Sequence, residues 1–589
     1  MSSQKAEKII CQNCKKDFTI ESEDFNFYEK MKVPPPTWCP ECRLIRRLVW
    51  RNDRYLSKIN CKLCGKVTFS TFPDNNTRIV YCSECYRSDA WDPLSYAQEY
   101  DFSKTFFEQF QELMQKVPVR ARFVSSGSLI NSDYTNLVSH LKNCYLIYNA
   151  DYSENCAYGT EIENSKECID NTMIDGCEHC YDNVNCQKCY KTFFSTDCIE
   201  SSDIWFSFDI IGCGDCFGCV GLRNKHYYIF NEPHTKEQYE NKVKEYFNGN
   251  FSDIAEIKSK VNEIYLKTPR RYIHGRQNTS VSGDYIYNSK EVKNSYIATE
   301  AQNCKYCMWL IVPTTKDCWD YTEYGDKAEE IYETITAGKG VSKMKFSSMV
   351  STNSSDVEYS FSCRDVQSIF GCNALKKKSF CILNKQYSKD EYEQLLPKIK
   401  KHMDDMPFFD KKGRIYKYGE FFPLELAPFA YNQTNAQEFF PLSKEGIEFL
   451  GCQFQEIADR DYTPTLRPDN LPNTMKEVDE SLIKEIIGCA EWGSEKARIQ
   501  NCTKAFRVTE NELVFYKRHK LPLPRKCPNC RHYDRIKRRN PITLWHRKCM
   551  CDKKNHDHKD NCSNEFKTSY APERPEIVYC EKCYQQETY

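Results

Sequence analysis

The centre of the chain alternates short runs of β-type residues with turn-forming residues. Residues 143–190 read NCYLIYNADYSENCAYGTEIENSKECIDNTMIDGCEHCYDNVNCQKCY. Cysteines recur there and onward every nine to twelve residues, at positions 144, 156, 168, 177, 189 and 198. This pattern predicts strands of a parallel β-solenoid, with one coil for every roughly 21–24 residues. Reduced cysteines suit the core of such a stack because they are small and apolar.

The same block recurs further along the chain. The segment SKECID at 165–170 returns as TKDCWD at 315–320, and FGCVGLRNKHYYIFN at 217–231 returns as FGCNALKKKSFCILN at 370–384. Each copy then enters a predicted helix that would cover the end coil. A capping box opens each helix, with the residue pairs Thr235/Gln238 and Ser388/Glu391.

Several cysteines of the central block have the close spacing of metal ligands. They are Cys177, Cys180, Cys186, Cys189, Cys213, Cys216 and Cys219. Packing in the core is the favoured interpretation, and metal binding stays open as the alternative.

The two ends of the chain have a different texture and share a signature, IVYCSECY at 79–86 and IVYCEKCY at 577–584. The first end contains four C-x-x-C knuckles. Two knuckles supply the four thiolates of a tetrahedral zinc site, so the spacing predicts two closed structural sites. Their ligands are Cys11, Cys14, Cys39, Cys42, Cys61, Cys64, Cys82 and Cys85.

The second end repeats this module, with seven cysteines in register and ten extra residues inside CMCDKKNHDHKDNC. Ile499 stands where Cys11 would be matched, and Cys489 upstream is the predicted substitute. Cys551, His556 and His558 compete with Cys549 for the second site, and Cys549 is favoured. The predicted ligands are Cys489, Cys502, Cys527, Cys530, Cys549, Cys562, Cys580 and Cys583, which gives about four structural zinc ions per chain.

A basic, predicted helical stretch follows the second knuckle of each module. Spacings of three and four residues place arginines on one helix face, where they can bind the phosphates of nucleic acid. These arginines are Arg43, Arg47, Arg51, Arg54, Arg531, Arg535, Arg538 and Arg539. The alternatives are that they balance the charge of the zinc thiolates or face solvent.

Charge is distributed unevenly, although the 589 residues carry no net charge. Residues 1–92 hold 16 basic and 12 acidic side chains, and residues 500–589 hold 20 and 11, so the remainder is acidic. Basic ends and an acidic centre indicate either an anionic partner or an electrostatic clasp between the ends and the middle.

Composition narrows the class of protein. Hydrophobic residues make up 40 % of the chain, no apolar run approaches the length of a membrane span, and the start MSSQKAEKII lacks the apolar region of a signal peptide. We therefore expect a cytoplasmic protein whose 35 cysteines are reduced, with disulfides as the alternative. Phosphate-binding loops, zinc-protease and serine-hydrolase motifs are absent. Asp170 and Asp320, at matching places in the two blocks, are expected to cap backbone N–H groups rather than to catalyse.

Several long motifs resemble a family of cysteine-rich zinc-knuckle and β-solenoid proteins from candidate-phyla-radiation bacteria. They include FYEKMKVPPPTWCPECRLIRRLVWRN, CFGCVGLRNKHYYIFNEPHTKEQYE, ILNKQYSKDEYE, EFFPLELAPFAYNQTNAQEFFPL and YAPERPEIVYCEKCY. The resemblance extends over essentially the whole chain. It implies zinc-binding ends and no particular activity.

The predicted fold is mainly β with α: a two-lobed parallel β-solenoid flanked by duplicated treble-clef or zinc-ribbon-like modules. The predicted segments are an N-terminal module at 1–92, an amphipathic helix linker at 93–126 packed on the first lobe, the first lobe at 127–250, a connector at 251–277, the second lobe at 278–402, an aromatic strap and linker at 403–480, and a C-terminal module at 481–589. The strap is expected to lie over the body without regular structure, or to form an exposed binding patch.

The favoured function is a non-enzymatic zinc-binding adaptor or scaffold that contacts nucleic acid or a ribonucleoprotein through the basic helices. The alternatives are a protein–protein scaffold whose end modules pair without nucleic acid, and a carbohydrate-active β-solenoid enzyme. No membrane partner is expected, and the oligomeric state is left open.

Overall fold

Two compact units make up the protein, and each combines one end of the chain with one lobe. The computed structural model describes residues 5–74, 76–326, 328–456, 463–558 and 560–588. Unit 1 consists of Met1–Arg122 and Ile273–Gln455, and unit 2 consists of Phe123–Tyr272 and Glu456–Tyr589. The N-terminal module therefore folds with the second lobe, and the C-terminal module folds with the first.

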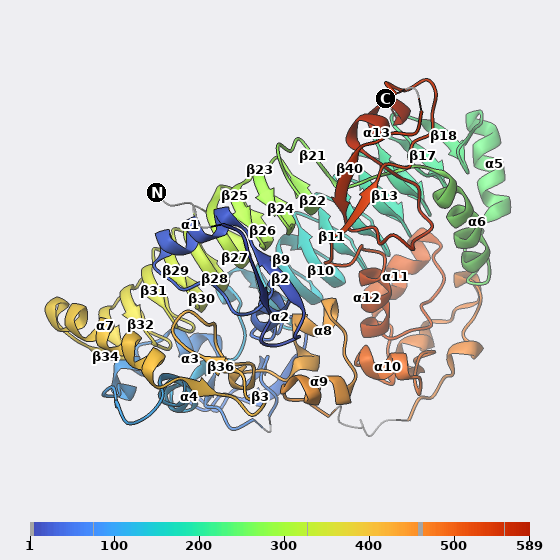
Figure 1. Cartoon of the computed structure of the whole chain (residues 1–589). Coiled ribbons are helices and arrows are strands. Elements are labelled where there is room, and N and C mark those ends of the chain that lie inside the picture. The colour runs from blue at the N-terminus through green and yellow to red at the C-terminus, as the bar shows by residue number, and fades with distance from the viewer. Residues whose placement is uncertain (1–4, 75, 327, 457–462, 559, 589) are drawn as a thin grey trace. The chain divides into compact units, whose positions relative to one another are not determined.

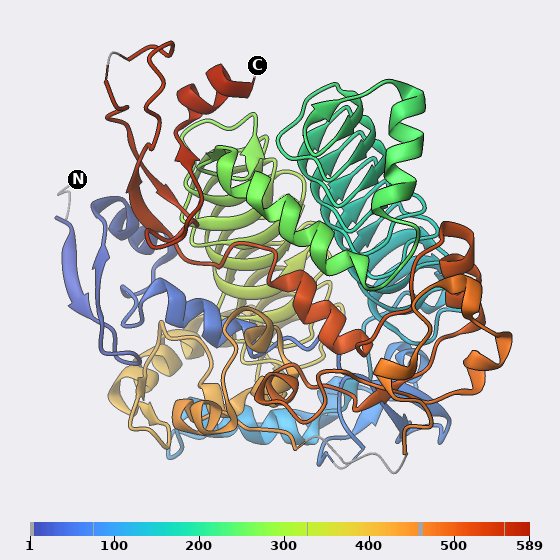
Figure 2. The ribbon, with the colours of Figure 1, turned by 90° about the vertical axis from the view of Figure 1, so that its right-hand side faces the viewer.

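The first lobe consists of large parallel sheets in which each strand pairs with the strand of the next layer. Tyr145 pairs with Ala157, and Thr172 pairs with Val184, so one layer advances the chain by twelve positions. The longer coil expected from the sequence is therefore wrong by a factor of about two. The stacked strands are seen from the side in Figure 2. They are β7 (Leu129–Ile130), β8 (Thr135–Lys142), β9 (Tyr145–Glu154), β10 (Ala157–Glu163), β11 (Thr172–Asp175), β12 (Val184–Gln187), β13 (Tyr190–Phe193), β14 (Thr196–Ile199), β15 (Ser202–Trp205), β16 (Phe208–Ile211), β17 (Gly214–Phe217) and β18 (His226–Ile229), with a short antiparallel β19 (Glu232–Pro233).

Within each layer of the first lobe, nearly every third backbone position takes a left-handed conformation. Asn143, Asn149, Asn155 and Asn164 have φ between 47° and 55°. Asn and Asp tolerate this conformation better than other residues with a Cβ atom, which explains the density of turn formers in this block. The residue after each of these positions points inward, so a layer has four inward side chains and a narrow core.

Small polar side chains in this core bond the backbone of neighbouring layers. The amide Oδ1 of Asn183 accepts from the backbone N–H of Ser195 at 2.9 Å, and Ser195 Oγ accepts from the N–H of Ser207 at 3.1 Å. The thiol of Cys156 donates to the carbonyl of Glu154 at 3.3 Å. These bonds satisfy the buried N–H groups of Ser195 and Ser207, as a dry interior requires.

The second lobe repeats this arrangement in one 14-stranded sheet. Gly283 pairs with Ser295, and Ala301 pairs with Thr315, so some layers are slightly longer than those of the first lobe. The strands are β21 (Gly275–Arg276), β22 (Gly283–Tyr287), β23 (Lys290–Lys293), β24 (Ser295–Thr299), β25 (Ala301–Lys305), β26 (Met308–Val312), β27 (Thr315–Gly325), β28 (Glu329–Gly338), β29 (Ser342–Lys345), β30 (Ser348–Ser351), β31 (Ser355–Glu358), β32 (Gln367–Phe370), β33 (Ser379–Ile382) and β34 (Lys385–Gln386).

A helix with a capping box follows the last strands of each lobe, as the sequence predicts. Helix α5 (Lys236–Tyr246) begins after Thr235 and contacts β18, and α7 (Lys389–Asp405) begins after Ser388 and contacts β33. Figure 1 shows α7 beside β32 and β34. The connector forms α6 (Asp253–Lys267).

Each module contains two hairpin-and-helix pieces. In the N-terminal module these are β1 (Glu7–Ile10) and β2 (Asp17–Ile20) with α1 (Ser22–Met31) and α2 (Pro40–Leu48), then β3 (Ser57–Asn60) and β4 (Val67–Ser70) with β5 (Val80–Tyr81) and α3 (Ser83–Arg87). In the C-terminal module they are β37 (Ile487–Gly488) and β38 (Ala505–Phe506) with α10 (Glu495–Ile499), α11 (Glu510–His519) and α12 (Pro528–Ile536), then β39 (Trp545–Lys548) and β40 (Glu565–Thr568) with β41 (Val578–Tyr579) and α13 (Glu581–Thr588).

Each module also forms one short parallel strand pair with a segment outside the module. Strand β5 pairs with β6 (Val119–Arg120) in unit 1, and β41 pairs with β20 (Arg270–Arg271) in unit 2. Both pairings involve the Val-Tyr of the shared signature, so the duplication extends to this contact.

The amphipathic helix α4 (Phe106–Lys116) packs on the second lobe, so its predicted packing on the first lobe is wrong. Phe106 lies 5.2 Å from Tyr359 and 5.1 Å from Phe370, measured between ring centroids. Nothing in the local amphipathic pattern specifies which of two similar lobes covers the apolar face.

The aromatic strap is part of the core of unit 1. Phe422 stacks on Trp50 of the N-terminal module at 4.5 Å between centroids and on Phe110 of α4 at 4.9 Å. Phe421, Phe422 and Tyr431 are fully buried, so these aromatic residues do not form an exposed binding patch.

Regular structure in the strap is limited to short elements, as its prolines predict. These are a hairpin of β35 (Phe408–Phe409) and β36 (Ile415–Tyr416), the helices α8 (Asn435–Phe439) and α9 (Lys444–Leu450), and several 3-10 turns. Part of the predicted linker, residues 457–462, lies outside the described residues.

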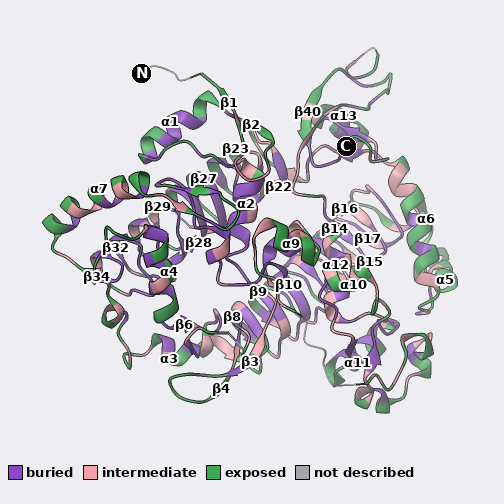
Figure 3. Ribbon diagram, turned by 60° about the horizontal axis from the view of Figure 1, so that its bottom comes forward, coloured by how far each residue is buried: buried purple, intermediate pink, exposed green. Residues whose placement is uncertain are grey.

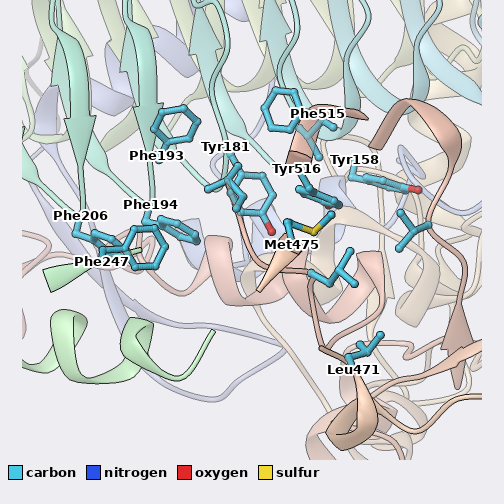
Figure 4. Packing of buried hydrophobic residues seen from close by; sticks show 14 of the residues in the cluster. Tyr158, Tyr181, Phe193, Phe194, Phe206, Phe247, Leu471, Met475, Phe515 and Tyr516 are labelled. Carbon is cyan, nitrogen blue, oxygen red and sulfur yellow. The ribbon is translucent and has the colours of Figure 1, made fainter. Parts of the chain in front are cut away.

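A large hydrophobic cluster joins the first lobe to the C-terminal module within unit 2 (Figure 4). Tyr181 of the lobe lies 5.6 Å from Tyr516 of α11, measured between ring centroids. Phe194 and Phe206 stack at 4.7 Å on the same outer side of the lobe.

Among the described residues, no helix has the length and apolar character needed to cross a membrane.

Candidate metal centres

All sixteen predicted ligands lie in four groups of four cysteines. Within each group the sulfur atoms lie within 4.8 Å of one another. The groups are Cys11/Cys14/Cys39/Cys42, Cys61/Cys64/Cys82/Cys85, Cys489/Cys502/Cys527/Cys530 and Cys549/Cys562/Cys580/Cys583. Each of these tetrads can hold a metal ion.

The spacing of the sulfur atoms fits a tetrahedral thiolate site. The Sγ–Sγ distances are 3.8 Å for Cys14–Cys39, 3.7 Å for Cys502–Cys527 and 3.9 Å for Cys562–Cys580. Four thiolates about 2.3 Å from a central zinc ion would lie about 3.8 Å apart. The donor set is therefore suitable for zinc.

The same local fold positions the ligands in every tetrad. The first pair of cysteines lies in the connection between two antiparallel strands, and the second pair lies at the start of a helix. Cys39 and Cys527 are the residues that precede α2 and α12. A helix N-terminus carries a partial positive charge, which stabilises thiolates there.

Backbone N–H groups also stabilise the thiolate of Cys61, the first ligand of the second tetrad. Burial alone would raise the pKa of Cys61, but the N–H groups of Cys64 and Cys82 outweigh it and lower that pKa to about 7. A lowered pKa favours the deprotonated form that binds metal.

The structure assigns the displaced ligand of the third tetrad to Cys489. In all four tetrads the first cysteine accepts a hydrogen bond from the backbone N–H of the third, at 3.2 Å. Cys39 donates to Cys11, Cys82 to Cys61, Cys527 to Cys489 and Cys580 to Cys549. Cys489 and Cys549 therefore occupy the position of Cys11 and Cys61, and Ile499 lies in α10.

Cys551 and the two insert histidines form a fifth group instead of replacing Cys549. Cys551, His556, His558 and Cys583 have their ligand atoms within 4.8 Å of one another. The sequence predicts Cys551, His556 and His558 only as competitors of Cys549 for one site. The signal for a separate group is the sequence CDKKNHDH inside the insertion, which the N-terminal module lacks.

The cysteines of the lobes belong to the packed core. Among the described residues, every candidate metal group lies in an end module. All 35 cysteines are free thiols, and those of the first lobe line the narrow core. The alternatives of disulfides and of metal binding by Cys177, Cys180 or their neighbours therefore have no support in the geometry.

The arginines predicted to bind nucleic acid are turned toward the lobes or, for Arg54, toward the strap, which corrects the prediction of an accessible basic face. The side chains of Arg43, Arg47, Arg51 and Arg535 are at most 1 % exposed, and those of Arg54, Arg531, Arg538 and Arg539 are at most 19 % exposed. Figure 3 shows α2 and the adjoining strands β27 and β28 as largely buried. A phosphate cannot reach a guanidinium that is enclosed by protein.

Each unit contains the same arginine–aspartate contact. In unit 1, Arg47 donates to Asp320 at 3.2 Å, to Thr322 Oγ1 at 3.2 Å and to the carbonyl of Tyr306 at 3.5 Å. The equivalent contacts appear in unit 2.

There, Arg535 donates to Asp170 at 2.9 Å, to Thr172 Oγ1 at 3.3 Å and to the carbonyl of Tyr158 at 2.9 Å. Arg43 and Arg531 contact the second oxygen of Asp320 and Asp170, at 2.8 and 3.3 Å. The two aspartates therefore bind arginine, whereas the sequence predicted that they cap backbone N–H groups.

Further ion pairs surround these contacts, and we call the whole set the arginine clasp. Arg46 binds Glu333 at 2.6 Å and Glu420 of the strap at 2.7 Å. The other pairs are Arg51–Glu323, Arg54–Glu438, Arg538–Asp182 and Arg539–Glu161. These pairs bear out the electrostatic clasp that the charge distribution indicated. The sequence predicts none of the partner acids, since Asp170 and Asp320 were expected to cap backbone N–H groups.

Burial affects the acids of the clasp. Desolvation raises the pKa of Glu333, although Arg46 and Arg47 oppose this shift. An acid enclosed in this way depends on its arginines to remain charged, so the clasp stabilises the docked module only as a complete set.

Comparison with known proteins gives little further information. No family model matches the chain, and no curated protein matches it. A solved structure of a protein provisionally described as an acetyltransferase, from Desulfovibrio desulfuricans G20, is 9 % identical in sequence and covers 49 % of this chain and 86 % of its own. The TM-score is 0.12, which supports no argument about fold or function.

Proposed function

We propose that this protein is a non-enzymatic, zinc-stabilised scaffold. In this proposal the lobes are β-solenoids, and each is braced by a treble-clef or zinc-ribbon-like module whose zinc ions hold the basic helix in place. The observation that carries the proposal is the contact at the centre of the arginine clasp, repeated in both units: Arg43 and Arg47 bind Asp320, and the equivalent Arg531 and Arg535 bind Asp170. The basic helices serve this internal contact.

The donor sets support structural rather than catalytic metal. Four thiolates complete the tetrahedral shell of zinc and leave no position for a substrate or an activated water, whereas catalytic zinc keeps one position open. Free thiols throughout the chain also suit a reducing compartment, so we place the protein in the cytoplasm.

In this proposal we favour a protein partner over nucleic acid. The nucleic-acid hypothesis depended on eight arginines whose side chains are enclosed by ion pairs with the lobes and, for Arg54, with the strap. It remains a prediction without a defined binding surface.

Metal analysis tests the zinc scaffold directly. We expect at least four zinc ions per purified chain, because four tetrads have the spacing of closed thiolate sites. Chelation should unfold the modules, measured as loss of helical circular dichroism, while the lobes keep their β signal because their cores contain no metal ligand. A metal content near zero in reduced, folded protein would refute the proposal.

The variant Arg535→Ala separates the scaffold from the nucleic-acid adaptor. Removing one partner of a buried ion pair should lower the free energy of unfolding by about 3–5 kcal/mol. Salt-dependent binding to RNA or DNA, if any, should not change in the folded variant. The exposed Arg507 of the same module supplies the control, since Arg507→Ala should alter stability by less than about 0.5 kcal/mol.

Weaker nucleic-acid binding by folded Arg535→Ala, with Arg507→Ala unaffected, would favour the adaptor instead.

A further inference from the structure

The insertion of the C-terminal module provides ligands that the N-terminal module does not have. It adds ten residues between the cysteines matched to Cys61 and Cys64, and it contains Cys551, His556 and His558. The two modules are otherwise equivalent around these sites, so the N-terminal copy serves as an internal reference with a single tetrad.

The insert ligands approach each other and the last tetrad closely. Cys551 Sγ lies 3.1 Å from His556 Nδ1, and His558 Nε2 lies 3.5 Å from Cys583 Sγ. Cys551 is fully buried, and the His556 side chain is 1 % exposed. Two thiolates and two imidazoles within 4.8 Å form a donor set suited to zinc.

The second nitrogen of each histidine faces an acceptor. The Nδ1 of His558 lies 2.5 Å from the carbonyl oxygen of Asp560, which leaves Nε2 with its lone pair toward Cys583. The Nε2 of His556 is buried without a hydrogen bond among the described residues, and a carboxylate oxygen of Glu587 lies 3.5 Å away. Histidines that bind metal usually donate their other N–H to a carbonyl or carboxylate, as His558 does to Asp560.

Contacts with α13 hold the insertion in this position. The backbone N–H of Asp557 donates to Gln586 Oε1 at 3.3 Å, and Lys553 pairs with Glu587 at 3.7 Å. The N–H of Cys562 donates to the carbonyl of Cys551 at 2.9 Å and closes the base of the loop. The ligands are thus brought together by the fold of the loop and not by the metal alone.

We propose that Cys551, His556, His558 and Cys583 bind an additional zinc ion, and that the Cys583 thiolate bridges it to the ion of the Cys549/Cys562/Cys580/Cys583 tetrad. The proposal rests on the proposed function in treating the tetrads as metal centres. Charge favours the pair: five thiolates and two Zn²⁺ carry −1, whereas one Zn²⁺ with four thiolates carries −2.

Metal content per chain gives the first test. Wild-type protein should contain five zinc ions, and the double variant His556→Ala/His558→Ala should contain four. His546→Ala, at an exposed position on β39, should retain five. Four ions in both wild type and the double variant would overturn the fifth site and leave the scaffold intact, whereas a content near zero would refute the scaffold as well.

Cadmium-113 NMR tests the bridge on the wild-type chain, so it does not depend on whether a variant folds. Two ions that share one thiolate should give two resonances with mutual scalar coupling, and one of the pair should be shifted by its nitrogen ligands. The tetrads of the N-terminal module should show no such coupling. A cadmium-loaded protein with no coupled pair would overturn the shared Cys583.

Discussion

At the scale of single residues, the role of an arginine depends on both its chemistry and its surroundings, as the clasp shows. Arg47 and Arg535 occupy equivalent positions in the two modules and bind equivalent aspartates, Asp320 and Asp170. The arginine stripe on each helix is visible in the sequence, but the same stripe would appear on a phosphate-binding helix. Burial of the arginine side chains distinguishes the two roles, because a fully enclosed guanidinium needs an acid nearby.

Glu358 of unit 1 leads to a pH-dependent prediction at this scale. Its carboxylate binds Lys400 at 2.7 Å, Lys345 at 3.3 Å and the hydroxyl of Tyr418 at 3.0 Å. Burial alone would raise the pKa of Glu358, but the two lysines outweigh it and lower that pKa below its usual value near 4.5. A lowered pKa in the folded state means that the charged form stabilises the fold above about pH 4.5.

We therefore expect Glu358→Gln to unfold more easily than wild type near neutral pH. The difference should shrink as the pH falls from about 4.5 through the lowered pKa of the folded state, because the wild-type carboxylate is then protonated. Urea unfolding of both proteins across this pH range measures the difference, and any general effect of acid on the modules cancels in the comparison. A gap that stays constant down to the lowest pH would contradict the assignment.

At the scale of elements, the sequence predicts the repeat of the lobes but not the number of residues in one layer. The sequence has cysteines at 168, 177 and 189, and the sum of the intervals between them, nine and twelve residues, was interpreted as one coil. In the structure Cys177 and Cys189 lie one layer apart in the same row of the core, whereas Cys168 belongs to another row, because each layer is short and has inward positions three residues apart. The capping boxes at Thr235 and Ser388 were predicted correctly, since a cap depends only on residues three apart.

The row of inward polar residues gives a prediction for the first lobe. Asn183→Ala removes the acceptor for the buried N–H of Ser195, and an unsatisfied buried donor costs about 1–3 kcal/mol. Asn183→Ser should lose less, because Ser195 itself performs this task for Ser207 in the same row. The free energy of unfolding measures both changes.

The outward-facing Lys166 supplies the matched control for this row. Lys166→Ala should be nearly neutral, because its side chain is exposed. An equal effect of Asn183→Ala, Asn183→Ser and Lys166→Ala would show that the inward row does not support the layers.

At the scale of the whole molecule, the order of segments along the chain differs from their grouping in space. The chain passes from the N-terminal module through the first and second lobes to the C-terminal module, yet each unit joins a module to the lobe more distant from it in sequence. Both the modules and the lobes are duplicated. The structure is therefore two copies of one module–lobe pair, connected crosswise.

Double-mutant cycles test the crosswise pairing. Arg47→Ala and Asp320→Ala should couple by about 0.5–3 kcal/mol, because residues in direct contact are not additive. Arg47→Ala and Asp170→Ala should be additive within about 0.5 kcal/mol, although Asp170 is the equivalent residue of the other lobe. Unfolding free energies of the single and double variants supply the coupling. Coupling of Arg47 with Asp170 and not with Asp320 would reverse the pairing.

The sequence alone determined the knuckles, the duplications and the capping boxes, and it predicted Cys489 as the substitute for Ile499, which the structure then assigned. Only the tertiary structure decided which lobe receives which module, where α4 packs, and that the insert residues form a group of their own beside Cys549. The reason is physical. A cysteine knuckle is complete within four residues, whereas the partner of Arg47 lies 273 residues away, and local charge cannot distinguish a buried clasp from a phosphate-binding surface.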